Sequence, residues 1–351
     1  METEQMKWRS VAHRKIPTQG AAQGRPSSMN RLSTAKFIGP YDLYLLLVMA
    51  LIKLLNQCPF LRMKEFFTRV VAFMAFHLSR CRRRVKERAL AQTLQLSPAE
   101  LRNITKQSFY HFWHDIFIAS SDGRNKQPGQ VNQVRGLERL TEALQKGRGV
   151  ILWESSFFGR RVMAKRILHE NGFSICQVHA ENHIGGFSDA KTWISKHVIQ
   201  PFFDNCERQF VKEIISLPGS DSLAFIRDLR ARLKHNSVLC ISADGRQGHK
   251  FLPVEFLGRT GSLSTGMVSL ARVSGATILP LFCVQEEGDR TTLVIESPIC
   301  IEADGDRERG FEKAIRQYAN LLDCYIKRYP QQYRNWNGVV GSDSNNTRAG
   351  Y

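Results

Sequence analysis

The sequence predicts an α/β domain built as three layers around a largely parallel sheet, preceded by a basic helical region that faces a membrane. From about residue 130 to 337, short apolar runs rich in β-branched residues alternate with stretches of helical periodicity. The chain has 351 residues, of which 42% are hydrophobic and 23% charged, enough to bury a large core. Basic residues gather beside two apolar stretches near the N-terminus, which points to an anionic surface.

The N-terminal part divides into a polar tail and an apolar, basic region. Residues 1–36 carry seven Lys or Arg against two Glu and show little periodicity, so we expect a disordered tail. It has no apolar core of the kind that a secretory signal needs. Residues 37–90 contain the apolar stretches Leu43–Ile52 and Phe66–Leu78, and from Leu61 to Leu90 nine basic residues stand against two acidic ones, a net charge of +7.

Apolar helices flanked by basic clusters suit a protein that lies on an anionic lipid surface. We therefore expect residues 37–90 to associate with the cytoplasmic face of the inner (plasma) membrane. The run Leu43–Ile52 is short beside the roughly 20 apolar residues that cross a bilayer, so a single span by residues 41–58 stays open. A buried helical hairpin with a solvated basic end is the alternative.

The formal net charge of +18 indicates an anionic partner. Sequence motifs then help to distinguish nucleic acid from a lipid surface. No basic strand interleaved with aromatic residues, helix-turn-helix pair or zinc spacing appears, so we expect no nucleic acid partner. The eight cysteines form no Cys-x-x-Cys pair and no cluster with histidine. We accordingly expect neither a bound metal nor another cofactor, and a membrane lipid is the favoured partner.

The remaining elements follow in order along the chain. Ser97, Pro98 and Glu100 form a capping box that starts a helix, and GVILW from Gly149 to Trp153 reads as a buried strand. A helix should begin near Gly159 and end near Gly172. Later strands are predicted at 173–178, 237–241, 276–284 and 291–295, and later helices at 223–233, 262–274 and 311–326, before a disordered tail at 338–351. Pro280 implies that its strand lies at an edge or contains a bulge.

Polar residues follow two of the predicted strands, where open α/β sheets bind their ligands. Glu154, Ser155 and Ser156 follow the strand that ends at Trp153, and Arg160 and Arg161 would stand in the first turn of the next helix. Free backbone N–H groups there favour an anion. A second group, Asp244 with Arg246 and Gln247, follows the strand 237–241. The alternative reading is a solvated helix start with a serine N-cap.

The stretch that begins at Asp244 resembles a known family. After Asp244 come Phe256, Leu257 and Gly258, then Ser264, Thr265 and Gly266, then Gly275, Ala276 and Pro280, and finally RYPQQYRNW at 328–336. In this order they resemble the lysophospholipid acyltransferase superfamily, specifically its lipid A biosynthesis (lauroyl/myristoyl) branch, over roughly residues 40–337. The resemblance implies an acyltransferase-like α/β domain over 91–337. It also implies transfer of a fatty acyl group from an acyl-carrier protein or coenzyme A thioester to a hydroxyl of a lipid or glycolipid.

The chain departs from the family where the chemistry should be. The family places a His in the first strand-to-helix loop, with an Asp or Glu five positions later; here Ser155 or Ser156 stands at the first position and Arg160 or Arg161 at the second. None of the ten histidines has an acid five positions on. A serine hydroxyl is no base near neutral pH, so the ordinary dyad is absent.

Three interpretations remain open. In the first, Glu154, or else Asp244, replaces the histidine as general base, which would need a raised pKa. In the second, Ser155 or Ser156 is a nucleophile that forms an acyl-enzyme with His179 or His183 as base. In the third, the chain is a non-catalytic pseudoenzyme that binds lipid or acyl-carrier protein through its arginines. The expected substrate-binding residues are Arg160, Arg161, Arg246, Gln247, Gly258, Ser264 and Thr265.

Overall fold

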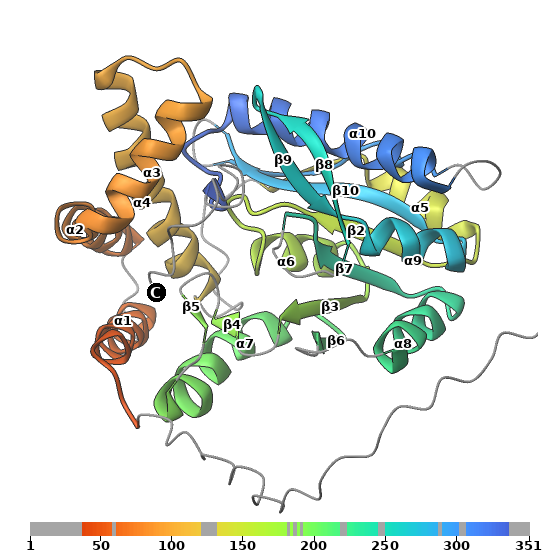
Figure 1. Cartoon of the computed structure of the whole chain (residues 1–351). Helices are drawn as coiled ribbons and strands as arrows, with labels where there is room; N and C mark the ends of the chain where they lie inside the picture. Colours follow the sequence, from red (N-terminus) through yellow and green to blue (C-terminus); the bar gives the residue numbers. More distant parts are fainter. Residues whose placement is uncertain are drawn as a thin grey trace, which may run out of the picture. The chain divides into compact units, whose positions relative to one another are not determined.

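The computed structural model describes most of the chain (Figure 1). The described residues are 37–57, 61–120, 132–180, 183–184, 188–189, 192–217, 223–244, 250–286, 290–301 and 307–336. The tails predicted at 1–36 and 338–351 lie outside them.

A seven-stranded sheet, with the order β1-β11-β10-β2-β7-β3-β6, forms the centre of the domain. Its strands are β1 (Asn132–Arg135), β2 (Val150–Glu154), β3 (Ile175–Ala180), β6 (Glu213–Leu217), β7 (Val238–Ser242), β10 (Thr277–Gln285) and β11 (Thr291–Ile295). Neighbours pair in parallel except β10 with β11. The predicted α/β class with a largely parallel sheet is therefore confirmed.

Helices cover both faces of the sheet, because central strands such as β2 present apolar residues to both sides. On β2, Ile151 and Trp153 belong to one hydrophobic cluster, and Val150 and Leu152 belong to another. The first cluster is completed by α8 (Leu223–Lys234), α9 (Gly266–Ser274) and α10 (Arg307–Arg328), and the second by α5 (Leu137–Gln145) and α6 (Met163–Glu170). This is the three-layer arrangement that the alternating pattern predicts.

Four N-terminal helices lie to one side of the sheet (Figure 1). They are α1 (Pro40–Gln57), α2 (Leu61–Leu78), α3 (Arg80–Thr93) and α4 (Pro98–Ala119). Apolar residues of α1, α2 and α4 form a third cluster with a π-helical turn, Ser195–Ile199, and α7 (Gln200–Arg208). The capping box at Ser97 and Glu100 is present at the start of α4. Within the described ranges, no helix is both long and apolar enough to span a bilayer.

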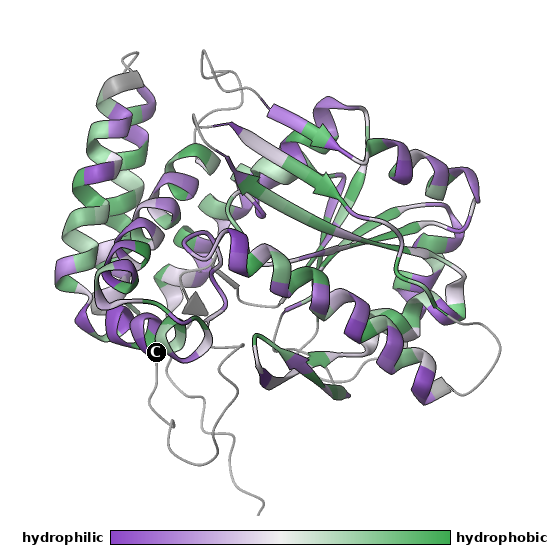
Figure 2. Ribbon diagram, turned by 90° about the horizontal axis from the view of Figure 1, so that it is seen from above, coloured by the Kyte–Doolittle hydropathy of each residue, from purple (hydrophilic) through white to green (hydrophobic). Residues whose placement is uncertain are grey.

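Hydrophobic residues are not confined to the buried faces. Figure 2 shows hydrophobic colour both along the strands of the sheet and along the helices at the left of the view. Large apolar side chains remain exposed on α1 and α2, among them Leu47 at 71% and Leu78 at 74%. Exposed apolar side chains of this size are available for contact with a partner or a lipid surface.

Two short strand pairs complete the fold, and one of them corrects a prediction. β4 (His183–Ile184) pairs with β5 (Ser188–Asp189), and β8 (Phe251–Phe256) forms a hairpin with β9 (Arg259–Ser264). The helix predicted from residue 262 therefore begins only at Gly266. The reason is the turn at Leu257 and Gly258, whose φ angles of 53° and 70° form a tight reversal between the two strands.

The helix predicted after β2 also starts later than expected. Gly159, with φ of 69°, turns the chain in the left-handed region, and α6 begins at Met163 rather than near Gly159. A Cβ at Gly159 would come within 2.7 Å of the Cys283 sulfur, so glycine is needed there for space as well as for conformation. Arg160 and Arg161 consequently lie in a turn before α6, and the expected helix N-terminus does not surround them.

Pro280 was expected at an edge or a bulge, but β10 lies inside the sheet between β11 and β2. The carbonyl of Pro280 accepts the Glu296 N–H at 2.9 Å, so its ring nitrogen faces the same side as β11. The β10–β11 ladder begins only at the pair Leu281–Ile295. The missing N–H therefore falls just beyond the last pair of the β10–β11 ladder, where it interrupts neither that ladder nor the pairing with β2.

Candidate functional site

The carboxylate of Glu154, at the end of β2, is buried among donors. Lys165 of α6 ion-pairs with it, Gln177 Nε2 donates to it at 3.1 Å, and Cys240 Sγ donates at 3.2 Å. The Arg160 guanidinium lies 4.0 Å away. Burial by itself would raise the pKa of Glu154, but the charges of Lys165 and Arg160 bring it below its ordinary value. Glu154 is thus a stabilised anion with both oxygens engaged.

The two serines after Glu154 have different surroundings although they are adjacent in sequence. Ser155 is 1% exposed, and its hydroxyl shares a hydrogen bond with the hydroxyl of Tyr318 on α10. Ser156 is partly exposed and turns toward the end of β7, where its Oγ donates to Asp244 Oδ1 at 2.9 Å and its N–H to Oδ2 at 3.0 Å. Only Ser156 combines a charged partner with access to solvent.

The Asp244 carboxylate collects several donors at this edge of the sheet. Besides both groups of Ser156, Ser242 Oγ donates to it at 3.2 Å and the buried Tyr333 hydroxyl is bonded to it. Arg160 Nη1 in turn donates to Ser242 Oγ at 2.9 Å. Burial, and after it the charge of Asp244, raises the pKa of Tyr333 far above its usual value, so this hydroxyl remains a donor.

Arg161 turns away from this cluster although it follows Arg160 directly. Its guanidinium pairs with Asp204 at 2.7 Å and with Glu207 at 3.2 Å, both on α7. Glu207 also accepts from His179 Nε2 at 2.8 Å. Burial would raise the pKa of Glu207, but His179 and Arg161 lower it to about 2. Arg161 and His179 are therefore committed to Glu207 and do not meet Ser156.

The C-terminal segment after α10 forms another wall of the site. Asn335 Nδ2 donates to the Asp244 carbonyl, and the Arg334 N–H donates to the Ser156 carbonyl at 2.9 Å. The Arg334 guanidinium pairs with Asp115 of α4, whose other oxygen accepts the Gly159 N–H at 3.1 Å. Residues far apart in sequence thus hold the loop that carries Ser156.

Other predicted site residues lie elsewhere or outside the described part of the chain. Arg246 and Gln247 are outside it, as is the side chain of His183. A narrow crevice at Asp244 is lined by β8–β9 and by residues after α10, but not by Gly258, Ser264 or Thr265. Gly258 forms the hairpin turn, and Ser264 Oγ accepts the Gly266 N–H at 3.3 Å. These three residues therefore do not line the crevice at Asp244.

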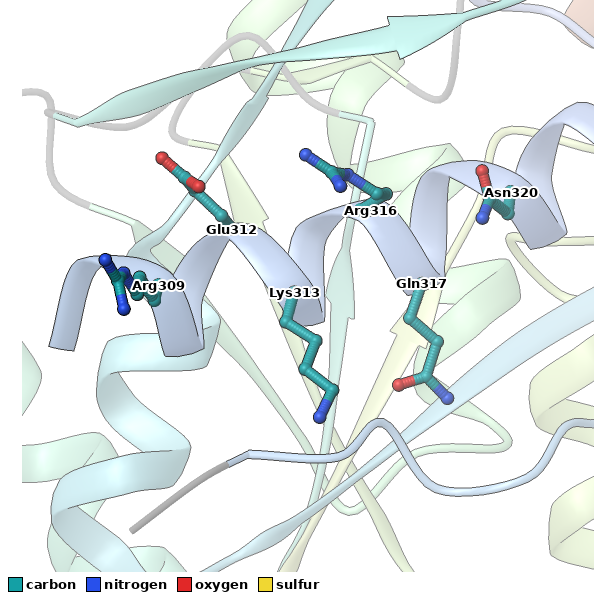
Figure 3. Close-up of a pocket in the computed structure, with 6 residues that line it drawn as sticks. All are labelled: Arg309, Glu312, Lys313, Arg316, Gln317 and Asn320. Carbon is teal, nitrogen blue, oxygen red and sulfur yellow. The ribbon is translucent and has the colours of Figure 1, made fainter. Parts of the chain in front are cut away.

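Neither a metal site nor the hollow on α10 competes with the Asp244 cluster. No group of three or more His, Cys, Asp or Glu able to hold a metal occurs in the ranges that the structure describes. A larger hollow lies on α10, but Figure 3 shows Glu312 and Arg316 pointing to one side of the helix and Lys313 and Gln317 to the other. Because these side chains do not converge, the Asp244 cluster is the stronger candidate site.

Sequence reasoning missed the residues that complete the cluster. Tyr318 on the last helix bonds Ser155 across 163 positions, and Asn335 after that helix bonds the Asp244 carbonyl across 91 positions. Tyr333 bonds the Asp244 side chain. Tyr333 and Asn335 have one signal in the sequence, the segment 328–336, which resembles the closing segment of the family, and Tyr318 has none. Lys165 carries no such signal, because a single lysine within a helical pattern usually lies at the surface.

Comparison with known proteins identifies the family. The sequence profile described as "Bacterial lipid A biosynthesis acyltransferase" matches residues 35–336, which is most of the chain. The chain belongs to this acyltransferase family. The resemblance read from the Asp244 segment is thereby confirmed.

Curated relatives of this family member are similar over part of their length. It is 23% identical over 199 residues to a phosphatidylinositol mannoside acyltransferase of Mycobacterium tuberculosis, a match covering 55% of this chain and 58% of the relative. It is 21% identical over 237 residues to the protein of the same name from Mycolicibacterium smegmatis, covering 67% of this chain and 71% of the relative. The chain thus spans little more than half the length of the first relative.

Proposed function

We propose that this family member transfers a fatty acyl group from an acyl-carrier protein or coenzyme A thioester to a hydroxyl of a lipid or glycolipid, with Asp244 as the proton acceptor. The observation that carries the proposal is the 2.9 Å hydrogen bond from Ser156 to Asp244 at the carboxyl edge of the sheet, beside a crevice. Family membership supplies the reaction class. The names of the mycobacterial relatives support a lipid acceptor.

The surroundings of the two carboxylates favour Asp244 over Glu154. Glu154 is paired with a buried ammonium and has a lowered pKa, both of which oppose proton uptake. Asp244 lines the crevice, and its donors include the hydroxyl of the partly exposed Ser156. An acceptor hydroxyl that displaced the Ser156 hydroxyl from Oδ1 would stand within proton-transfer distance of the carboxylate.

The proposed reaction is one acyl transfer with a balanced proton. Asp244 takes the proton of the acceptor hydroxyl as its oxygen attacks the thioester carbonyl, and Arg160 stabilises the oxyanion that forms. The tetrahedral intermediate then collapses by breaking the carbon–sulfur bond. The departing thiolate receives the proton from Asp244, which leaves an ester, a free thiol and the original carboxylate.

The test uses purified protein in detergent or liposomes, with radiolabelled acyl-carrier and coenzyme A thioesters and a total lipid extract. We expect labelled lipid from the wild type and a loss of about 100-fold or more in Asp244→Asn, the range of general-base contributions. Asp228→Asn, an exposed change on α8, is the matched control. Equal turnover in Asp244→Asn and wild type would refute the assigned base.

Serine variants separate the base mechanism from an acyl-enzyme. Ser156→Ala should lower turnover by less than tenfold if Asp244 acts on the acceptor directly, because the carboxylate keeps its other donors. A loss as large as that of Asp244→Asn, with label retained on the wild-type protein after denaturation, would instead assign Ser156 as a nucleophile. Ser155→Ala tests fold stability only, since its hydroxyl is buried against Tyr318.

A second candidate is a non-catalytic module that binds a lipid or an acyl-carrier protein. One observation favours it: no histidine side chain contacts Ser156 or Asp244 in the described part of the chain, and the Asp244 carboxylate already has hydrogen-bond donors. Lipid binding by the wild type without transfer from either thioester would make this the better function.

We also propose that α1 and α2 rest on the anionic cytoplasmic leaflet of the inner membrane. Exposed apolar residues there are Leu43, Leu47, Leu54, Met63, Phe66, Phe73, Met74 and Leu78. The basic stretch 61–90 contains the α2 residues and follows those of α1, and both features strengthen adhesion to anionic lipid. In vesicle flotation with phosphatidylglycerol, Leu47→Ser/Leu78→Ser should float several-fold less than wild type. Ile226→Ser, an exposed apolar change on α8, is the control, and equal flotation of all three proteins would contradict the assignment.

A further inference from the structure

One face of α3 carries two cations that pair with no acid in the part of the chain that the structure describes. Arg82 and Lys86 are four residues apart and therefore lie on the same side of the helix. Arg82 Nη2 donates to the Tyr41 hydroxyl at 2.9 Å, and Lys86 Nζ donates to Ser108 Oγ at 2.5 Å. Neither forms an ion pair with a carboxylate among the described residues. Arg83, on a neighbouring face, does form one, with Glu87 at 3.6 Å.

A third cation, Arg334, contacts the same face of α4 as Lys86 does. Ser108, Phe112 and Asp115 are spaced four and three residues apart, so they share one face over a length of about 10 Å. Lys86 contacts the first of them, while the Arg334 guanidinium lies 5.3 Å from the Phe112 ring centre and pairs with Asp115. The helix therefore holds both cationic groups against a single surface.

The electrostatics agree with this arrangement. Lys86 is half-buried, and burial followed by the charges of Arg334 and Arg82 lowers its pKa to about 7. Burial, and then the charge of His114, lowers the pKa of His111 to about 4, with smaller contributions from Arg334 and Lys86. These cations repel one another, and a bound anion would relieve that repulsion.

The described acid at this surface is already committed. Asp115 accepts from both the Arg334 guanidinium and the Gly159 N–H. Its one negative charge balances only part of the positive charge of Arg82, Lys86 and Arg334. Like charges four residues apart on a helix are destabilising, so the arrangement indicates a role beyond stability.

The cations adjoin the candidate site. Arg334 donates its backbone N–H to the Ser156 carbonyl, and the Phe158 ring contacts His111 and His114 on α4. We propose that Arg82, Lys86 and Arg334 bind a phosphate ester carried by one of the substrates. Two guanidinium forks and a compact ammonium are the groups best suited to phosphate oxygens. This inference takes one element from the proposed function, namely that the phosphate ester belongs to the thioester donor or to the lipid acceptor.

Binding is measured by titration calorimetry with two soluble probes, coenzyme A and dihexanoyl phosphatidylglycerol below its critical micelle concentration. We expect the wild type to bind at least one probe and Arg82→Gln/Lys86→Met to bind it at least tenfold more weakly. The matched control Arg83→Gln should change affinity less than twofold. Loss for coenzyme A assigns the donor, and loss for the phospholipid assigns the acceptor.

Several outcomes would overturn the site. These are no binding of either probe by wild type, unchanged affinity in the double variant, or an equal loss in Arg83→Gln. A double variant that loses vesicle flotation yet binds both soluble probes normally would also overturn it, and would assign Arg82 and Lys86 to the membrane surface. Lys86→Arg keeps the charge and should bind within threefold of wild type, which guards against a folding artefact.

The two proposals fail separately. Asp244→Asn should bind the soluble probes as the wild type does, because Asp244 contacts none of the three cations through a described ion pair. Probe binding without acyl transfer by wild type would therefore refute the proposed reaction and leave the phosphate site. Acyl transfer without any effect of the double variant on probe affinity would refute the site alone.

Discussion

Replacing Lys165 with Met tests whether Glu154 is a structural anion. The Lys165 side chain is 0% exposed; its ammonium pairs with Glu154 and donates to the Arg160 carbonyl at 2.7 Å. Methionine preserves the packing of the aliphatic stem but leaves the carboxylate buried, with Arg160 at 4.0 Å as its remaining cation. Removing one partner of a buried pair costs about 3–5 kcal/mol, and we expect the lower end because Arg160 compensates in part.

The assay is urea unfolding followed by tryptophan fluorescence at pH 7.5. We expect Lys165→Met to lower the free energy of unfolding by about 3 kcal/mol, and Lys106→Met, an exposed change on α4, by less than about 0.5 kcal/mol. The double variant Lys165→Met/Glu154→Gln removes both charges. It should therefore lose less than the sum of the two single variants.

The pH dependence gives an independent sign. Without Lys165, burial should raise the pKa of Glu154 above its unfolded value, so the folded variant takes up a proton as the pH falls. Its deficit relative to wild type should then shrink between pH 7.5 and 5. A deficit below about 1 kcal/mol, additive single effects, or a deficit that grows at low pH would refute the assignment of Glu154 as a paired anion.

Two further predictions concern the surroundings of the site. Burial would raise the pKa of Glu207, but its two basic partners lower it to about 2, so the stability it supplies is present above pH 4.5 and lost as the pH falls toward 2. In Glu207→Gln the urea midpoint of unfolding should change less with pH over that range than in the wild type. An equal dependence on pH in both proteins would count against the pairing. Gly159→Ala should cost more than about 2 kcal/mol in thermal unfolding, because φ is 69° and the new Cβ would lie 2.7 Å from a sulfur atom. Gly172→Ala, with φ of 85° and open space, should cost about 1 kcal/mol, and equal losses would show that crowding at Gly159 is unimportant.

Most of the sheet and its covering helices could be predicted from the sequence. The strand at 149–153, the helix at 223–233 and the capping box at Ser97 are all present within a residue or two. They are set by local signals: β-branched runs, apolar spacing and a side chain that caps its own helix. The β8–β9 hairpin was missed because its reversal places Leu257 at positive φ, where a β-turn more often uses Asn or Asp.

The order of the strands belongs to the tertiary structure. The sequence around Pro280 indicates an edge, yet β10 is internal, because the partner strand β11 ends beside the proline. Nothing within the β10 sequence specifies where a neighbouring strand will stop. Sheet position depends on pairing between segments that are distant along the chain.

By itself the sequence determined that polar residues follow β2 and β7, that the histidine dyad of the family is absent, and which family the chain resembles. Only the tertiary structure separated adjacent residues: Ser155 packs against Tyr318 while Ser156 meets Asp244, and Arg160 approaches Ser242 while Arg161 turns to α7. The periodicity of apolar residues indicates which side of its own helix or strand a side chain occupies. The partner that a side chain finds can lie far along the chain, 163 positions away for Ser155 and Tyr318, which no local pattern encodes.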